Sequence, residues 1–148
     1  ARLIMSVSAL EAVVGFNNAS FTLIHVMSRP IGALFHVAHG LSNAMLMKEC
    51  LGFALEGAYE RFAVLGQTIG VSGMEDSGRI AGEKFLAAVI ALTEELETPT
   101  LEEYGISKDV FFQSIPKMAQ DAMTSGSPQN TLREVTQQDV EQMYKNLW

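Results

Sequence analysis

Apolar residues recur every three or four positions along almost the whole chain, the spacing that places them on one face of an α-helix. The first such stripe follows Leu3, Val7, Leu10, Val14, Phe21 and Ile24. No stretch of useful length alternates strictly between apolar and polar residues, as a half-buried strand would. The pattern therefore predicts an all-α, bundle-like array of helices, arranged as a single domain over residues 1–148.

Proline, glycine and capping residues divide this pattern into helices. Pro30 lacks an amide hydrogen and disfavours helical geometry in the residue before it, so we expect the first helix to end or kink near Ser28. A loop of small residues should follow as far as Gly40. The further helices are expected at about 41–47, from 56 to 70, from 76 or 77 to 97, from 100 to 105, from 107 with a kink at Pro116, and from 136, with a polar loop at 124–130.

Two capping boxes and several buried faces are also predicted. Thr100 with Glu103, and Thr136 with Asp139, have the spacing of a threonine cap and an acidic residue three positions later. Asp76 or Ser77 can cap the long helix that ends at Glu97. The stripes of the later helices are expected to face inward, and they include Leu65, Leu92, Leu96, Val110, Phe111, Ile115, Val140, Met143, Tyr144 and Leu147.

Composition and charge exclude several classes of protein. Of the 148 residues 48% are apolar and 18% charged, which is the profile of a globular interior. Ten basic against 17 acidic residues give a net charge of -7, so we expect no nucleic-acid partner. The longest interior apolar run, residues 85–92, is less than half of a membrane span, and the first ten residues lack the layout of a secretory peptide. A single cysteine, Cys50, excludes internal disulfides and fits a reducing compartment. We therefore expect a cytoplasmic protein without a membrane partner.

The three histidines are the most unusual feature, because His25, His36 and His39 fall within 15 residues. On one straight helix His25 and His39 would lie about 21 Å apart, but a break at Pro30 would let the chain reverse and bring both rings to one point. Asn18 lies two turns before His25 on nearly the same face, which suggests a polar cavity. The spacing leaves other interpretations open: a hydrogen-bonded core histidine, a helix cap, or a solvent-exposed ring.

Three segments carry a resemblance to a known family. They read GFNNAS over residues 15–20, HVMSRPIGA over 25–33 and HVAHGLSNA over 36–44. Together they resemble the iron-containing (group III) alcohol dehydrogenases, whose pattern has a G-x-x-F-N-N-A segment, a metal-binding histidine, a P-x-G turn and an H-G-x-x-N-A segment that opens with another metal-binding histidine. Weaker similarity continues at ERFA (60–63), IGV (69–71) and REVT (133–136).

The resemblance implies a metal site and a fold. In that family one Asp and three His hold a divalent metal, typically Fe(II) and sometimes Zn(II), and His25 and His39 match the last two histidines, with the same spacing of 14. No residue here corresponds to the Asp, to the first His or to the glycine-rich nucleotide-binding segment. The resemblance thus implies the C-terminal part of the dehydroquinate-synthase-like helical domain of an enzyme that oxidises alcohols to aldehydes or ketones. We expect this chain alone to be inactive.

Cofactors and lining residues follow from the same resemblance. It implies Fe(2+) or Zn(2+), NAD or NADP bound mainly by an N-terminal domain, and a small alcohol or aldehyde substrate, and it assigns no catalytic residue here. Arg29 stands where the family often has a histidine beside the substrate. A guanidinium stays protonated and cannot act as a base, so Arg29 either holds an anionic group or is a surface residue. Arg29, His36 and Asn18 are the candidates for lining the site.

The alternative function is a non-catalytic one. A helical module that has kept the fold could serve only in assembly, because the stripe from Leu3 to Ile24 should be partly uncovered and exposed apolar patches drive self-association. A helix-turn-helix DNA-binding protein is disfavoured, since the chain is acidic and no candidate recognition helix carries a cluster of basic residues.

Overall fold

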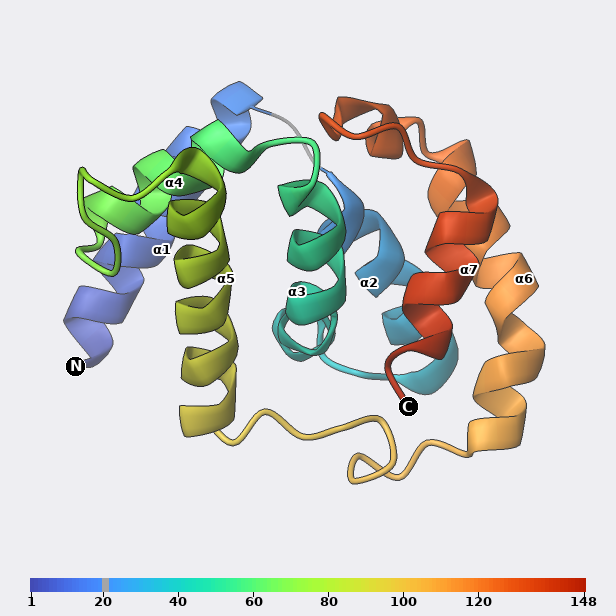
Figure 1. Ribbon diagram of the computed structural model, residues 1–148. Helices are drawn as coiled ribbons and strands as arrows, with labels where there is room; N and C mark the ends of the chain where they lie inside the picture. Colours follow the sequence, from blue (N-terminus) through green and yellow to red (C-terminus); the bar gives the residue numbers. More distant parts are fainter. Residues whose placement is uncertain (20–21) are drawn as a thin grey trace.

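The computed structural model describes residues 1–19 and 22–148, except for the side chains of residues 16, 18 and 19 (Figure 1). Within these ranges the chain has no strand and forms helices throughout. They are α1 (Arg2–Ala19), α2 (Leu23–Phe35), α3 (His39–Leu55), α4 (Tyr59–Thr68), α5 (Gly78–Glu95), α6 (Lys108–Thr124), the 3₁₀ helix η1 (Ser127–Asn130) and α7 (Gln137–Lys145). The predicted all-α fold is confirmed.

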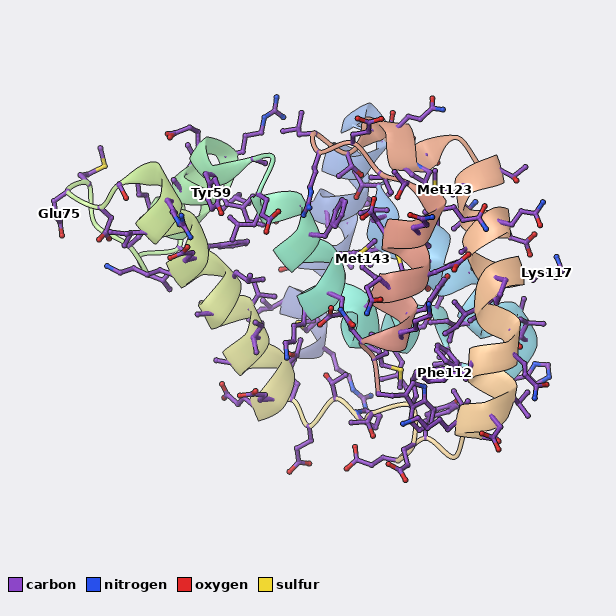
Figure 2. All side chains as sticks on the ribbon, turned by 45° about the vertical axis from the view of Figure 1, so that its right-hand side comes forward. Tyr59, Glu75, Phe112, Lys117, Met123 and Met143 are labelled. Carbon is purple, nitrogen blue, oxygen red and sulfur yellow. The ribbon has the colours of Figure 1, made fainter. Side chains whose placement is uncertain are left out.

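The helices pack as a row in which each contacts the next. α4 lies along α5, α5 against α3, α3 against α2, α2 against α6, and α6 against α7 (Figure 1). The main core fills the space between α2, α3, α6 and α7, where Met27, Leu46, Phe111 and Tyr144 are fully buried. In Figure 2 Met143 points into this core from α7, whereas Lys117 points outward from α6. α2 is therefore the central helix, covered on two sides.

α1 stands apart from this row. Every residue from 1 to 15 is exposed, and Leu3 is 77% exposed. α1 has no extensive contact with another helix among the described residues. The expected first helix is wrong in its extent, because α1 ends at Ala19 and a separate helix begins at Leu23. The N-terminal apolar stripe is therefore split between a fully exposed helix and the buried α2.

Pro30 does not end the helix, which corrects the sequence-based expectation. It lies inside α2, which continues to Phe35. An interior proline costs about 3 kcal/mol. The neighbouring Val26, Met27 and Ile31 are each at most 2% exposed, and burying each such side chain contributes about 1.5–3 kcal/mol. Tertiary packing thus outweighs the lost hydrogen bond.

The chain reverses after α2 rather than at the proline. His36 adopts a left-handed conformation with φ 56°, and its N–H donates to the carbonyl of Gly32. A side chain at Gly32 would meet the Val37 carbonyl at 3.2 Å, so this close approach favours glycine. Only residues 36–38 separate the helices, and α3 begins at His39 and extends to Leu55 instead of covering 41–47.

The capping residues behave largely as expected. Thr136 and Asp139 form a complete capping box at the start of α7, and the Ser77 hydroxyl accepts from the Ile80 N–H at the start of α5. Thr100 and Glu103 also make both reciprocal hydrogen bonds. They close a turn, however, and the expected short helix at 100–105 does not form.

Four residues expected inside are exposed: Leu65, Leu92, Leu96 and Val110. Periodicity locates an apolar face but does not guarantee a neighbour for all of it. α5 contacts only α4 and α3 extensively, so its final turns have no helix to cover them. The polar segment at 124–130 contains η1 instead of a simple loop.

Candidate metal centre

The reversal between α2 and α3 brings two of the three histidines together. His25 lies in the first turn of α2 and His39 is the first residue of α3. Their ring centroids are 5.2 Å apart and the ring planes meet at 60°. Two imidazoles from adjacent helix starts thus converge, although the reversal lies at 36–38 and not at Pro30.

A network of hydroxyl groups lies beneath His39. The Oγ of Ser28 is 3.0 Å from Nδ1 of His39 and 2.6 Å from the Oγ of Ser42. The Ser42 hydroxyl donates to the His39 carbonyl at 3.1 Å. On the other side of the ring, Nδ2 of Asn43 lies 3.3 Å from Nε2. Both nitrogens of His39 therefore have polar neighbours in the structure.

The electrostatic surroundings favour neutral imidazole. Burial lowers the pKa of His25, and electrostatic interactions with His39 and Arg29 lower it further. Metal binding requires the neutral ring. At neutral pH His25 is therefore in the protonation state that can act as a ligand.

The pair fits half of a metal site. Imidazole nitrogen is a ligand that suits both iron and zinc. Among the residues that the structure describes, no group of three or more His, Cys, Asp or Glu side chains lies close enough to hold an ion. A four-ligand set that included His25 and His39 would need its remaining ligands from outside these residues.

The other predicted lining residues are placed differently. Arg29 is exposed one turn after His25 and lines a hollow of about 280 Å³ that also contains Asp121 and Ser125. His36 is exposed at the end of α2, and it does not join His25 and His39 in a three-residue ligand group. The side chain of Asn18 lies outside the described residues.

Ser28 and Ser42 are site residues that the sequence reasoning missed. Each lies three positions after one of the paired histidines, and on a helix residues three apart share a face. The repeated H-x-x-S spacing, at 25–28 and 39–42, is the signal that could have identified them.

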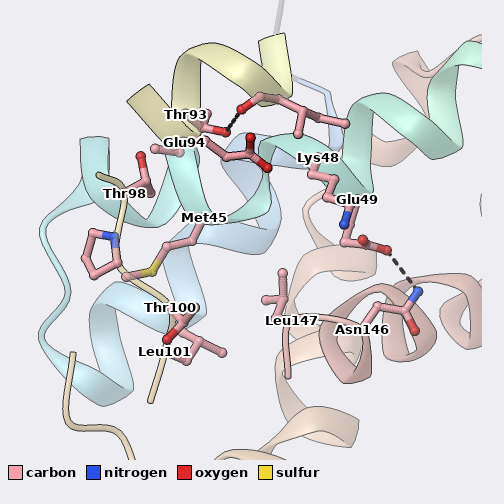
Figure 3. A pocket seen from close by; sticks show the side chains of 13 residues that line it. Met45, Lys48, Glu49, Thr93, Glu94, Thr98, Thr100, Leu101, Asn146 and Leu147 are labelled. Carbon is pink, nitrogen blue, oxygen red and sulfur yellow. Dashed lines mark hydrogen bonds between the residues drawn. The ribbon is translucent and has the colours of Figure 1, made fainter. Parts of the chain in front are cut away.

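A second hollow, of about 250 Å³, lies between α3, α5 and the segment that follows α5 (Figure 3). Met45, Lys48 and Glu49 border it from α3, and Asn146 donates a hydrogen bond to Glu49 at 2.8 Å. No histidine lines this hollow. It is therefore separate from the histidine pair.

Comparison with known proteins identifies the family. The profile of the Fe-containing alcohol dehydrogenase family, C-terminal, matches residues 1–148. The chain belongs to this family. Lactaldehyde reductase from Escherichia coli K12 is 29% identical over 149 residues, which cover 97% of this chain and 37% of the reductase. NAD-dependent methanol dehydrogenase from Bacillus methanolicus is also 29% identical, over 99% of this chain and 38% of its own length.

Solved structures of iron-type dehydrogenases share the helical fold. The crystal structure of a 1,3-propanediol oxidoreductase superposes with a TM-score of 0.81 at 26% identity, over 90% of this chain and 34% of that one. An alcohol dehydrogenase from Oenococcus oeni gives 0.79 at 25% identity over the same shares. The chain thus spans little more than a third of the length of these family members. Within its described part, no helix is both long and apolar enough for a bilayer.

Proposed function

We propose that this chain supplies two metal ligands, His25 and His39, to an NAD(P)-dependent dehydrogenase that oxidises small alcohols to aldehydes or ketones. The observation that carries the proposal is the convergence of the two rings at 5.2 Å in a chain of the iron-containing family. Relatives named NAD-dependent methanol dehydrogenase and NADPH-dependent butanol dehydrogenase support a nicotinamide cofactor of either kind. We propose Fe(2+) or Zn(2+) as the metal and the cytoplasm as the location.

The residues of this chain have distinct parts in the proposed reaction. When bound, the metal supplies Lewis acidity toward the substrate oxygen, and the hydride chemistry belongs to the nicotinamide. His25 and His39 each offer one neutral ring nitrogen. Arg29 cannot take a proton from the substrate, and its charge beside His25 favours an anionic group there. We propose that the nucleotide site and the other ligands are supplied from outside this chain, and we therefore expect the chain alone to be inactive.

A Zn²⁺ titration of the chain tests the ligand assignment. With ¹⁵N-labelled histidine, NMR resolves the three rings individually. We expect the His25 and His39 signals to change together with a single dissociation constant, because one ion contacts both. His36 serves as the internal control, and the variant His36→Ala should bind Zn²⁺ as wild type does.

The variant His39→Ala decides the matter. It should abolish the response of His25 to Zn²⁺, since a single imidazole binds an ion far more weakly than a pair. The assignment is wrong if His25 responds equally in His39→Ala, or if neither ring responds to millimolar Zn²⁺ in the wild-type chain.

The exposed α1 supports a second candidate function, in which the chain is a non-catalytic module that associates with copies of itself. Leu3, Leu10 and Val14 are 77%, 64% and 59% exposed on α1, and an uncovered apolar surface favours association. We propose no nucleic-acid or membrane partner. Light scattering should show oligomers that dissociate in the double variant Leu3→Lys/Leu10→Lys, whereas a wild-type monomer at all concentrations contradicts this candidate.

A further inference from the structure

Two fully buried serines lie beneath the same histidine, His39. Ser28 and Ser42 are each 0% exposed. A buried hydroxyl is costly unless it is hydrogen-bonded, so the positions and bonding of these two serines call for a physical reason. Their hydroxyl oxygens are 2.6 Å apart, and one of them lies 3.0 Å from Nδ1 of His39.

The direction of the hydrogen bonds follows from counting protons. The three shortest contacts of this network are all hydrogen bonds only if the Ser42 hydroxyl proton is directed to the His39 carbonyl at 3.1 Å, because a carbonyl can only accept. Ser42 then accepts from the Ser28 hydroxyl, since each hydroxyl has a single proton. The Ser28 oxygen is left as the acceptor for a proton on Nδ1. The chain of bonds thus runs from the His39 ring, through both serines, to the His39 backbone.

The opposite nitrogen faces a donor. Nδ2 of Asn43 lies 3.3 Å from Nε2 of His39, and an amide N–H there needs a lone pair on Nε2 to accept it. With the Asn43 amide in this orientation, which leaves its Oδ1 buried without a partner, the two sides of the ring agree on one tautomer, with the proton on Nδ1 and the lone pair on Nε2. A metal ion that takes this lone pair would replace the Asn43 contact.

We propose that Ser28, supported by Ser42, is a positioning residue that keeps the proton on Nδ1 of His39 and presents Nε2 as the metal-binding nitrogen. This inference rests on the proposed function above. Metal-binding histidines are commonly held by an acceptor on the second ring nitrogen, and loss of that acceptor lowers metal affinity about 10- to 100-fold. Here a buried hydroxyl takes the place of the usual carboxylate or carbonyl.

The tautomer of His39 can be measured directly on the metal-free chain. With ¹⁵N-labelled histidine at about pH 8, long-range ¹H–¹⁵N correlation shows which ring nitrogen carries the proton. We expect the proton on Nδ1 in the wild type and a shift toward the Nε2 tautomer in Ser28→Ala, because the Nδ1–H then loses its acceptor at 3.0 Å. In Ser42→Ala the Ser28 hydroxyl can still donate to the His39 carbonyl, at 3.4 Å, so we expect a smaller shift.

Zn²⁺ affinity provides the second measurement. Ser28→Ala should weaken Zn²⁺ binding about 10- to 100-fold, and Ser42→Ala should weaken it less. Ser114→Ala is the matched control, since the Ser114 hydroxyl bonds the Val110 carbonyl on the same helix, away from the histidines. Circular dichroism verifies that each variant folds. The tautomer of His39 in the wild type is measured without any variant, so this test does not depend on their folding.

The outcomes separate this inference from the proposed function. A wild-type proton on Nε2 overturns the inference, as does a Ser28→Ala variant with wild-type affinity while His39→Ala loses binding. If neither Ser28→Ala nor His39→Ala affects Zn²⁺ binding, the proposed function itself fails.

Discussion

The hydroxyl of Tyr144 links α7 to α2 through a hydrogen bond, and removing it should lower the free energy of unfolding by a predictable amount. Tyr144 is 0% exposed and donates to the Met27 carbonyl at 2.7 Å. Burial raises the pKa of the phenol, so the group stays protonated and donates throughout the physiological range. Tyr144→Phe keeps the ring packed against Phe111 and deletes only this bond.

We expect Tyr144→Phe to lower the free energy of unfolding by about 1 kcal/mol, the net value of one intramolecular hydrogen bond. With a urea m-value near 2 kcal/mol/M for a small protein, the midpoint should fall by about 0.5 M. Urea unfolding followed by far-UV circular dichroism measures this shift.

Tyr104→Phe is the matched control for this prediction. The Tyr104 hydroxyl also faces a backbone carbonyl, that of His36, but at 3.4 Å and with the side chain 40% exposed. Its removal should change stability by less than about 0.5 kcal/mol. Equal urea midpoints for the two variants would refute the reasoning, because the buried bond would then contribute no more than the exposed one.

Four further predictions test packing and capping. Cys50 is 2% exposed and burial raises the pKa of its thiol, so a maleimide should label it only after urea unfolding. Gly66→Ala should destabilise the protein by about 1–3 kcal/mol, because its Cβ would lie 2.9 Å from a backbone oxygen of α5, whereas Gly52→Ala, with 3.8 Å of room, should stabilise α3 by about 0.5–1 kcal/mol. Thr136→Ala should cost about 1 kcal/mol. Hydrogen bonds from Thr136 lower the pKa of Asp139, so the carboxylate contributes stability above the unfolded pKa, near 3.9. That contribution is lost as the pH falls through the lower folded value, and the stability difference between wild type and Asp139→Asn should shrink below about pH 4.

The thiol, glycine and carboxylate predictions each have a clear contrary result. Labelling of the native thiol at the rate of the unfolded chain would show that α3 opens readily around it. The same sign of change in the two glycine variants, measured by urea unfolding, would contradict the close approach of α4 to α5. An acid dependence of Asp139→Asn identical to that of wild type would show that the capping box does not couple to the carboxylate.

Local signals in the sequence predicted local structure well. The Thr136–Asp139 box and the Ser77 cap act within one turn of helix, so the residues that determine them lie next to one another. The behaviour of Pro30 could not be predicted in this way. Its place inside α2 depends on packing against α3 and against α6, which lies more than 70 residues further along the chain.

In the candidate site, too, some features could be predicted from the sequence and others depend on how the helices pack. Family motifs drew attention to His25 and His39, and the structure places the rings side by side, though at a different reversal from the expected one. Their role as ligands stays a prediction. The serine pair was missed because serine occurs in many structural roles, and its position in a sequence does not distinguish among them. Ser28 gains its role only when α3 brings His39 over it.

The short connection between α2 and α3 also affects the order in which the molecule assembles. The bond from Ser28 to Ser42 closes a loop of 14 residues, whereas that from Tyr144 to Met27 spans 117. Loop-closure entropy favours the shorter loop by about 2 kcal/mol, and local contacts speed folding. The hairpin that carries the histidines can therefore form before the C-terminal helix closes over it, and a metal ion present at that stage would meet His25 and His39 already side by side in a partly folded chain.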